Sequence, residues 1–426
     1  MVNVAIIGGG WSGCAAAISA AKAGAKVTLL ERTDMLLGTG LVGGIMRNNG
    51  RYTATEEAIA MGANELFNIT DETSTHKDID FPGHKHATLY NVGKIEPHVR
   101  KELEKHGIEI LLKSRFTDVE MDGNKIVSVT TFDGKKVEAD VFVDTTGTAG
   151  PQGNCAKYGN GCAMCALRCP SFGPRVSVTG KAGIEEFQGY KADGTIGAMS
   201  GSCKLMKESL SDDVLKTLNE TGVAVVPIPE ELRHEDVLGK KACQQYALKE
   251  FAENVILLDT GHAKLMTPFF DIDQLRLIPG FEEARFEDPY AGGKGNSMRY
   301  LAIAPRNNNL KVDGVDNLFC AGEKSGLMVG HTEAIVTGYL AGNNAVRTVL
   351  NKELLELPTS TAIGEAIAFV GEKMKTKEGR SLKYTFSGSV LFEHIKDLGM
   401  YTTDKEVIGK RVKDAGVYKV FDEKLV

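Results

Sequence analysis

Four of the eight cysteines in this 426-residue sequence lie close together, at Cys155, Cys162, Cys165 and Cys169. Thiolates with this spacing, C-x6-C-x2-C-x3-C, can bind an iron–sulfur cluster that passes single electrons. Cys162 and Cys165 could instead cycle between a dithiol and a disulfide. A tetrahedral zinc site needs four ligands, of which C-x2-C supplies half, and four ordinary buried thiols are the remaining alternative. We predict an accessory redox centre here, either a [4Fe–4S] cluster or a dithiol with Cys162 and Cys165 as catalytic residues.

The expected cellular compartment supports a redox or metal role for these cysteines. The sequence has no apolar run of the roughly 20 residues needed to cross a bilayer, and its start, MVNVAIIGGG, lacks the basic segment of a signal peptide. We therefore predict a cytoplasmic protein without a membrane partner. Structural disulfides are rare in a reducing compartment, so clustered cysteines there more often bind metal or undergo redox chemistry.

Three polar residues are candidates for substrate chemistry beside a cofactor. His262 or Tyr300 could move a proton while a hydride is transferred, and Arg299 could bind an anionic substrate. Each also has a structural alternative, because a lone histidine or tyrosine is often a packed residue and an arginine often pairs with a carboxylate. The histidine-rich segment HKDIDFPGHKH, residues 76–86, is interpreted as a solvated loop, since no two of its histidines have helical spacing.

The elements that would position these groups begin at the N-terminus. Residues 2–34, VNVAIIGGGWSGCAAAISAAKAGAKVTLLERTD, read as a buried strand, a glycine turn, an alanine-rich helix and a second strand. Gly8, Gly10 and Gly13 fit the G-x-G-x-x-G pattern, in which glycines permit a tight turn and close approach of a diphosphate. Glu31 ends the second strand, where a carboxylate can accept hydrogen bonds from both ribose hydroxyls. This unit predicts a dinucleotide site.

Three later segments favour FAD over NAD as the dinucleotide. Residues 32–50 contain a second glycine-rich loop, GTGLVGG, that could wrap phosphate and flavin. Residues 108–150 predict a strand, two hairpins and a buried return strand, VFVDTTG. Residues 314–350 predict a strand that ends at Ala321-Gly322-Glu323 and a helix that begins near His331.

These segments resemble the FAD-dependent oxidoreductases with a glutathione-reductase-type flavin domain. The segment LFCAGEKSGLMVGHTEAIVTGYLAGNNA is similar to the glucose-inhibited division protein A and folate/FAD-dependent tRNA methyltransferase families, whereas the GTGLVGG loop is more similar to the broad FAD-dependent oxidoreductase family. The resemblance implies that Glu323 holds the ribityl chain of FAD. It also implies that the helix beginning near His331 points its positive end at the flavin, where reduction places negative charge.

The motifs and the resemblance together define the predicted cofactor-binding residues. They are Gly8, Gly10, Trp11, Ser12, Gly13, Glu31, Arg32, Gly38, Gly40, Leu41, Val42, Gly43, Arg115, Phe116, Thr146, Gly147, Gly322, Glu323, Gly330 and His331.

Two departures from the tRNA-modifying families affect the predicted function. Those families place a catalytic cysteine in the glycine loop, and LLGTGLVGGIM has none. The net charge of −6 also disfavours a surface that neutralises phosphates, so nucleic acid is not the expected partner. We predict an FAD-dependent oxidoreductase that exchanges electrons with a small-molecule substrate. The alternatives are a flavin-dependent tRNA-modifying enzyme and an electron-transfer subunit with a redox partner protein; a homo-oligomer is a further possibility.

The expected fold class is α/β, with a Rossmann-like FAD domain divided between residues 1–150 and 311–350. Residues 151–310 form the predicted α+β substrate domain, which opens with the cysteine segment. In it, RVSVTG and VAVVPIP read as strands and SDDVLKTLNETG as a helix. Residues 351–426 form a mainly helical tail with a possible final strand in GVYKVFDEKLV.

Overall fold

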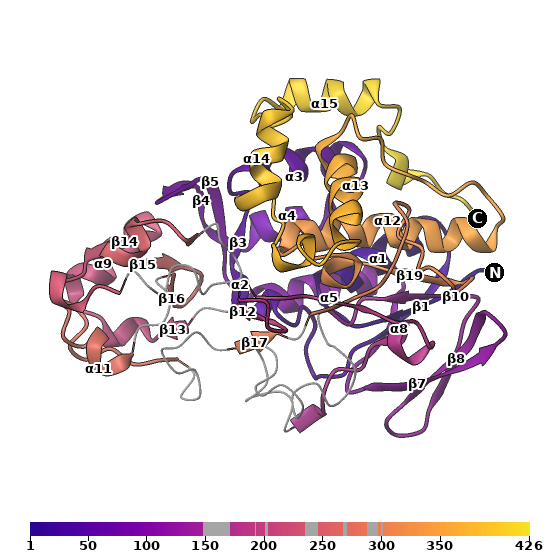
Figure 1. The fold of residues 1–426 in the computed structure, drawn as a ribbon, viewed down its shortest axis with the longest axis horizontal. Coiled ribbons are helices and arrows are strands. Elements are labelled where there is room, and N and C mark those ends of the chain that lie inside the picture. Colours follow the sequence, from indigo (N-terminus) through magenta and orange to yellow (C-terminus); the bar gives the residue numbers. More distant parts are fainter. Residues whose placement is uncertain are drawn as a thin grey trace.

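The computed structural model describes residues 1–147, 171–191, 193–200, 203–234, 246–266, 271–287, 297–299 and 301–426 (Figure 1). A five-stranded sheet forms the centre, in the order β19 (Leu318–Cys320), β10 (Val141–Asp144), β1 (Asn3–Ile7), β2 (Lys26–Leu30) and β6 (Glu109–Leu111). All its pairings are parallel. From β1 the chain continues to β2 on one side, and β10 lies on the other side of β1, so the strand order reverses at β1. Ligands of open α/β sheets bind where the strand order reverses, beyond the carboxyl ends of the strands.

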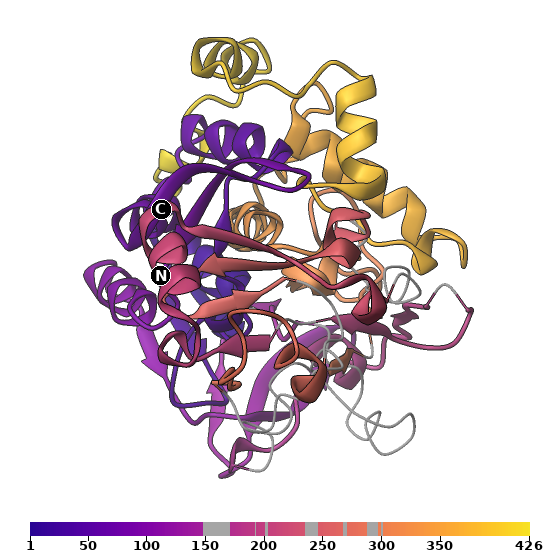
Figure 2. The ribbon, with the colours of Figure 1, turned by 90° about the vertical axis from the view of Figure 1, so that its left-hand side faces the viewer.

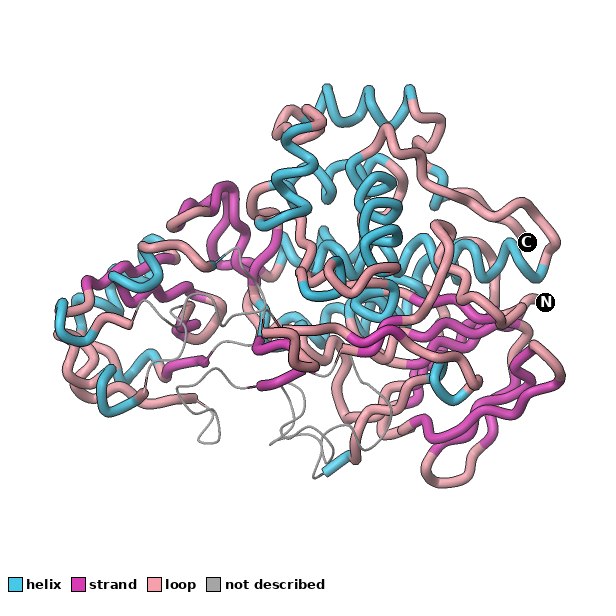
Figure 3. The backbone as a smooth tube through the Cα atoms, viewed as in Figure 1, coloured by secondary structure: helices cyan, strands magenta, loops and turns pink. Residues whose placement is uncertain are grey.

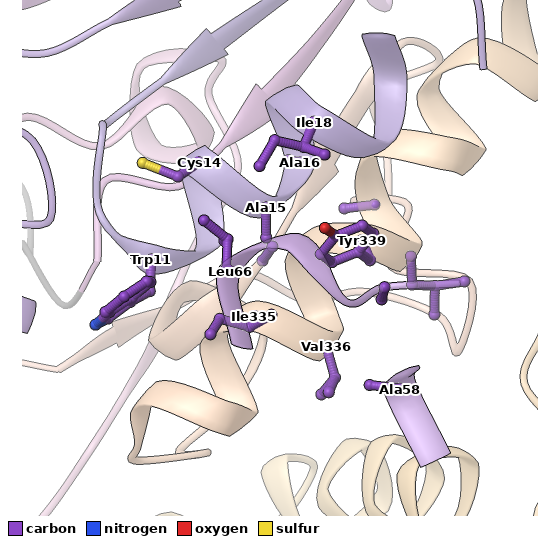
Figure 4. Packing of buried hydrophobic residues seen from close by; sticks show 14 of the residues in the cluster. Trp11, Cys14, Ala15, Ala16, Ile18, Ala58, Leu66, Ile335, Val336 and Tyr339 are labelled. Carbon is purple, nitrogen blue, oxygen red and sulfur yellow. The ribbon is translucent and has the colours of Figure 1, made fainter. Parts of the chain in front are cut away.

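One face of this sheet is covered by three helices, α1 (Trp11–Lys22), α5 (Ile95–Lys105) and α12 (His331–Val349). Helices α1 and α12 approach closely because small residues line their contact (Figure 4). A Cβ atom added to Gly338 would lie 2.4 Å from the Ser12 carbonyl oxygen, and one added to Gly342 would lie 2.2 Å from that of Ala16. This close packing fixes where the first turn of α12 lies relative to the turn after β1.

The other face packs against a three-stranded antiparallel sheet of β7 (Phe116–Asp122), β8 (Lys125–Thr131) and β9 (Lys136–Glu138). Ala5 and Phe142 of the parallel sheet share a buried cluster with Phe116 and Val129 of this second sheet. Both faces of the parallel sheet are therefore buried, which explains its nearly continuous apolar strands. The two hairpins predicted within residues 108–150 are confirmed as β7–β8 and β8–β9.

A four-stranded antiparallel sheet lies apart from the parallel sheet, at the left of Figure 1 and toward the viewer in Figure 2. We call it the cap sheet; its order is β13 (Cys203–Leu205), β16 (Ala263–Leu265), β15 (Asn254–Asp259) and β14 (Val223–Pro227). Helix α9 (Asp212–Thr221) packs on it, and the short helices α10 (Glu250–Glu253) and α11 (Ile272–Leu275) lie beside it. The helix predicted in SDDVLKTLNETG is confirmed: the Ser211 hydroxyl caps its start, and Gly222, with a φ of 80°, ends it.

The histidine-rich segment is not a loop, so that interpretation is wrong. Residues 74–90 form a hairpin of β4 (Ser74–Phe81) and β5 (His84–Tyr90), extended by β3 (Ile45–Met46). Phe81, Ala87 and Leu89 are buried in one cluster, and His84 is itself buried with its Nδ1 2.9 Å from the Asn48 amide. Burial of these alternating apolar side chains outweighs the polar residues between them.

The C-terminal helices α13 (Ala362–Met374), α14 (Ser389–Asp397) and α15 (Lys405–Asp414) lie with α3 (Gly50–Ala60) at the top of Figure 3, where α3 contacts α13 and α15. Helix α4 (Glu65–Glu72) contacts α5. The final strand predicted in GVYKVFDEKLV is wrong, because residues 420–422 form a short 3-10 turn against the end of α3. The strand predicted in RVSVTG is also wrong: the helix α8 (Val178–Lys181) begins there, capped by the Ser177 hydroxyl.

The remaining short elements are α2 (Gly40–Gly43), β11 (Phe187–Gln188), β12 (Ala198–Ser200), β17 (Ser297–Arg299) and β18 (Ala302–Ile303). The predicted Rossmann-like α/β fold is confirmed, with antiparallel sheets added to the parallel one. Strands of the parallel sheet come from residues before 150 and after 310, whereas the limits of the substrate domain stay a prediction. Among the described helices, none has the length and apolar character needed to cross a membrane.

Candidate functional site

A cavity opens at the carboxyl ends of the parallel strands. Gly8 follows β1, Glu31 follows β2, Thr145–Gly147 follow β10 and Gly322–Glu323 follow β19, and all of them line this cavity. The glycine loop around α2 and the first residues of α12 form a second wall. The cavity therefore lies where the fold alone predicts a nucleotide site.

The glycines of the first turn do different jobs. A Cβ atom on Gly13 would lie 1.8 Å from the Gly8 carbonyl oxygen, so this glycine permits the close approach of α1 to β1. A Cβ atom on Gly10 would meet nothing within 4 Å and would project into open space. No side chain caps α1 at Gly10, so the amide groups of its first turn remain available to an anion. This turn fits a diphosphate.

Glu31 is held in one orientation at the cavity wall. One oxygen of its carboxylate accepts a hydrogen bond from the Gly9 amide at 2.8 Å, and the other accepts from the amide and hydroxyl of Thr33 at 2.8 and 2.9 Å. A carboxylate oxygen has room for a second hydrogen bond. Glu31 can therefore also accept hydrogen bonds from the ribose hydroxyls of a nucleotide, as the sequence predicts.

Three arginines lie at this end of the cavity. Arg32, Arg115 and Arg175 all line it. Arg32 donates to the Gly173 carbonyl oxygen at 2.5 Å, whereas the buried Nη1 atom of Arg115 has no hydrogen-bond partner among the described residues. A buried guanidinium nitrogen without an acceptor is costly, and an anionic ligand would supply the acceptor. The donors present here fit the phosphates of a dinucleotide.

Side chains from three different strands hold the glycine loop at α2. The Tyr90 hydroxyl donates to the Gly40 carbonyl oxygen at 2.5 Å, and the Lys204 ammonium donates to that of Leu41 at 3.0 Å. The Lys264 ammonium donates to the carbonyl oxygens of Val42, at 2.8 Å, and Gly43. Every carbonyl of this one-turn helix thus has a side-chain donor, where a helix end normally leaves carbonyls unpaired. The cap sheet fixes the loop through the two lysines.

The start of α12 is fixed by a buried ion pair. Arg51 Nε lies 3.2 Å from both carboxylate oxygens of Glu333, and Arg51 also donates to the Val329 carbonyl oxygen at 3.2 Å and the Thr385 hydroxyl at 2.9 Å. A Cβ atom on Gly330 would lie 2.0 Å from Glu333 and 2.2 Å from Arg51. The pair therefore fits only against a glycine, and it fixes the backbone that leads into the helix.

The structure brings most of the predicted cofactor-binding residues together. All of them line the cavity except Gly13 and Gly40, which pack against Gly8 and Trp11 instead. Sequence reasoning missed other lining residues, among them Arg51, Arg175 and Lys264. None of the three lies in a recognisable motif, and each reaches the cavity through tertiary packing, so the sequence offers no signal for them.

The structure describes only some of the predicted catalytic residues His262, Arg299 and Tyr300. His262 is not among the residues that line the cavity; its Nδ1 lies 3.3 Å from the Glu287 carboxylate. Burial and the Lys204 ammonium lower the pKa of His262, so it is neutral near pH 7. Arg299 ends β17, and Tyr300 lies outside the described residues. Their roles stay predictions.

The cysteine segment also lies outside the described residues, which end at Gly147 and resume at Ser171. Cys155, Cys162, Cys165 and Cys169 are therefore not placed. Within the part of the chain that the structure does describe, no three His, Cys, Asp or Glu side chains gather as a metal site. The iron–sulfur cluster and the dithiol stay predictions.

The fold and the cavity define a flavoprotein with a Rossmann-like FAD-binding domain. Residues 3–267 and 270–353 match the family model of glucose inhibited division protein A, and the chain belongs to this family. A crystal structure of GidA from Aquifex aeolicus is similar to 97% of this chain and 73% of that one, with a TM-score of 0.68 and 16% identity, which establishes a shared fold.

Two curated relatives match over shorter stretches. The tRNA uridine 5-carboxymethylaminomethyl modification enzyme MnmG of Chlorobaculum tepidum is 32% identical over 145 residues, which are 33% of this chain and 21% of that protein. The methylenetetrahydrofolate–tRNA-(uracil-5-)-methyltransferase TrmFO of Caldicellulosiruptor bescii is 33% identical over 109 residues, 26% of this chain and 24% of that protein. These alignments span only about a fifth to a quarter of each relative.

Proposed function

We propose that this protein is an FAD-dependent enzyme and that its substrate is a base in tRNA. The observation that carries the cofactor assignment is the cavity at the strand ends, with the uncapped start of α1 and the unpartnered Arg115 Nη1. The tRNA assignment is supported by the family and by the two relatives, whose names describe tRNA-modifying enzymes. It replaces the small-molecule oxidoreductase as the leading interpretation.

FAD would supply two-electron redox chemistry. Gly10 and the first turn of α1 would hold the diphosphate, Glu31 the adenosine ribose and Arg115 a phosphate oxygen. Glu323 lines the cavity and would hold the ribityl chain. The start of α12, which no side chain caps, would face the developing negative charge with its positive end.

A second candidate, an oxidoreductase for a small molecule, is favoured by two specific observations. The net charge of −6 disfavours RNA binding, and the loop of residues 38–44 has no cysteine. In this candidate the cysteine segment after Gly147 would be an accessory redox centre. Anaerobic purification with iron, sulfide and zinc analysis tests that centre: about four irons and four sulfides per chain support a [4Fe–4S] cluster, and their absence refutes it.

The deciding experiment measures FAD and tRNA binding by the same preparation. We expect an absorbance spectrum of bound oxidised flavin and a tRNA affinity that falls steeply with salt, because phosphate contacts release counterions. A G10A variant, whose methyl group would enter the diphosphate space, controls for specific FAD binding. Absence of tRNA binding at low salt, with FAD bound, refutes the tRNA proposal and favours the second candidate. Absence of FAD binding refutes both.

A further inference from the structure

Arg51 of α3 lines the cavity, and four of its five N–H groups have acceptors in the protein. Its Nε donates to Glu333, and its Nη2 donates to the Val329 carbonyl oxygen and the Thr385 hydroxyl. Its Nη1 donates to the side-chain oxygen of Asn48 at 3.1 Å. The second N–H group of Nη1 has no acceptor among the described residues. Arg51 can therefore donate one further hydrogen bond to a group bound in the cavity.

The ion pair of Arg51 and Glu333 has its positive partner at the cavity. Arg51 lines the cavity, whereas Glu333 is not among the lining residues and its side chain is 0% exposed. The guanidinium also lies against the backbone at Gly330, since a Cβ atom there would be 2.2 Å from Nη2. Gly330 is the residue before α12, so Arg51 adds a full positive charge beside the partial positive charge of the helix start. A cation at this place is unfavourable by itself and favourable for a bound negative charge.

The backbone that leads to Arg51 is held in an unusual conformation. Arg47 and Asn49 have φ angles of 60° and 54°, which residues other than glycine adopt rarely, and the ψ angle of Asn49 is −130°. Between them Asn48 is buried; its amide lies 2.9 Å from His84 Nδ1, and its side-chain oxygen accepts from Arg51. Backbone of this kind costs free energy and occurs mostly at functional sites. The strain therefore supports a functional role for the side chain that this segment orients, which is Arg51.

We propose that Arg51 binds the ring system of FAD through Nη1 and raises the reduction potential of the bound cofactor. This role rests on the proposed function, because it assumes that FAD occupies the cavity with its rings at the start of α12. Reduction places negative charge on the rings, and a fixed cation beside them stabilises that charge more strongly than it stabilises the neutral oxidised form. A purely structural role of the ion pair, which fixes the backbone before α12, predicts no such effect on the potential.

Two variants should shift the reduction potential in opposite directions. Glu333→Gln removes the carboxylate and leaves the guanidinium uncompensated, so the potential should rise. Arg51→Met combined with Glu333→Gln removes the cation at the cavity without leaving a buried carboxylate unpaired, so the potential should fall. In each direction we expect at least about a 10-fold change in the ratio of the Kd values for oxidised and reduced FAD, which is about 30 mV for a two-electron couple. The potential is measured from the absorbance of bound FAD in equilibrium with redox dyes.

The matched controls are Glu57→Gln, alone and combined with Arg411→Met. Glu57 belongs to the same helix as Arg51, is buried, pairs with Arg411 at 3.0 Å and accepts hydrogen bonds from the first two amides of α13. Neither Glu57 nor Arg411 lines the cavity, so both controls should keep the wild-type potential.

An unchanged potential in both variants of the Arg51–Glu333 pair, with FAD bound, overturns the proposed role of Arg51 and leaves the cofactor assignment standing. Shifts of the same sign in these two variants, or equal shifts in the controls, also overturn it, because they indicate a general change of structure. If the double variant does not fold, Glu333→Gln and Glu57→Gln decide, and a potential that rises only in Glu333→Gln supports the role. Failure of the wild type to bind FAD overturns the proposed function and this role together. No tRNA enters the measurement, so a failure of the tRNA assignment is seen separately.

Discussion

Replacement of Gly10 or Gly13 by alanine distinguishes the two roles of the glycines in the first turn: space for the diphosphate at Gly10, and close approach of α1 to β1 at Gly13. In G13A the new methyl group would begin 1.8 Å from the Gly8 carbonyl oxygen and 2.9 Å from the Thr145 hydroxyl. Because carbon contacts are favourable only near 3.5–4.0 Å, α1 would have to move by more than about 1 Å from β1. α1 is also packed tightly on α12, where Gly338 contacts Ser12. We expect a loss of about 3 kcal/mol or more of unfolding free energy, at the upper end of overpacking costs.

In G10A the methyl group would meet no protein atom within 4 Å, and Gly10 has a φ of −70°, which alanine adopts readily. The FAD-free variant should keep its unfolding free energy within about 0.5 kcal/mol of the wild type. The methyl group occupies space that the diphosphate needs, so the Kd for FAD should rise at least about 10-fold, which corresponds to about 1.4 kcal/mol.

The assay combines urea unfolding of the FAD-free proteins with titration of FAD, followed by flavin fluorescence. The wild type and both variants are measured in parallel at one salt concentration. Wild-type FAD affinity in G10A would refute the placement of the diphosphate at this turn. Wild-type stability in G13A would refute the claimed approach of α1 to β1.

Three further predictions concern side chains that sequence reasoning did not assign or assigned only by resemblance. R115M removes the guanidinium whose buried Nη1 has no partner among the described residues. The FAD-free variant should lose little stability, while the Kd for FAD, measured by fluorescence, should rise about 10-fold because a phosphate loses a charged donor. An unchanged Kd would exclude this contact. K264M leaves two carbonyls of α2 without their ammonium donor. Hydrogen–deuterium exchange across residues 38–46 should accelerate at least about 10-fold, which corresponds to a decrease of about 1.4 kcal/mol in the free energy of local opening. The control K410M, on the exposed surface of α15, should leave the exchange rate unchanged. In Asp259, burial alone would raise the pKa, but the Lys207 ammonium at 2.7 Å and His76 at 3.0 Å lower it below its usual value of 3.8. The unfolded chain therefore binds more protons at acidic pH, so the stability advantage of the wild type over D259N should be full above pH 3.8 and shrink as the pH falls below it, as urea unfolding at several pH values would show; a constant difference would contradict this assignment.

The sequence predicts the parts of the site that belong to local motifs. The first strand, the glycine turn, α1 and Glu31 follow from residues adjacent in the chain, because periodicity and glycine spacing report local geometry. The return strand β10 and the start of α12 at His331 were found the same way. The errors also have local causes. RVSVTG alternates like a strand, but Ser177 caps a helix there, and residues 76–86 look polar although Phe81 and His84 are buried.

Contacts between distant segments are the part that the sequence does not predict. The Arg51–Glu333 pair joins positions 282 residues apart, and Lys204 and Lys264 reach the glycine loop from more than 160 residues away. A lone lysine or arginine in a sequence is more often a solvated side chain, so no pattern marks these three. The partners of these three side chains depend on how the sheets and helices pack against one another, and that arrangement is not encoded in any local pattern.

The cap sheet has a structural role at the cavity, because it holds the glycine loop at α2 in place. The loop carries no buried apolar side chain and has one turn of helix, so it cannot hold its shape alone. Its carbonyls are held by Tyr90 from β5, Lys204 from β13 and Lys264 from β16. Two of these donors belong to the cap sheet, which the sequence suggests only as a substrate domain. Since the same loop places Gly43 against the His331 ring, a substrate that displaces the cap sheet would also move a residue that lines the cavity. The cap sheet therefore reaches the wall of the cavity through three backbone carbonyls, those of Leu41, Val42 and Gly43.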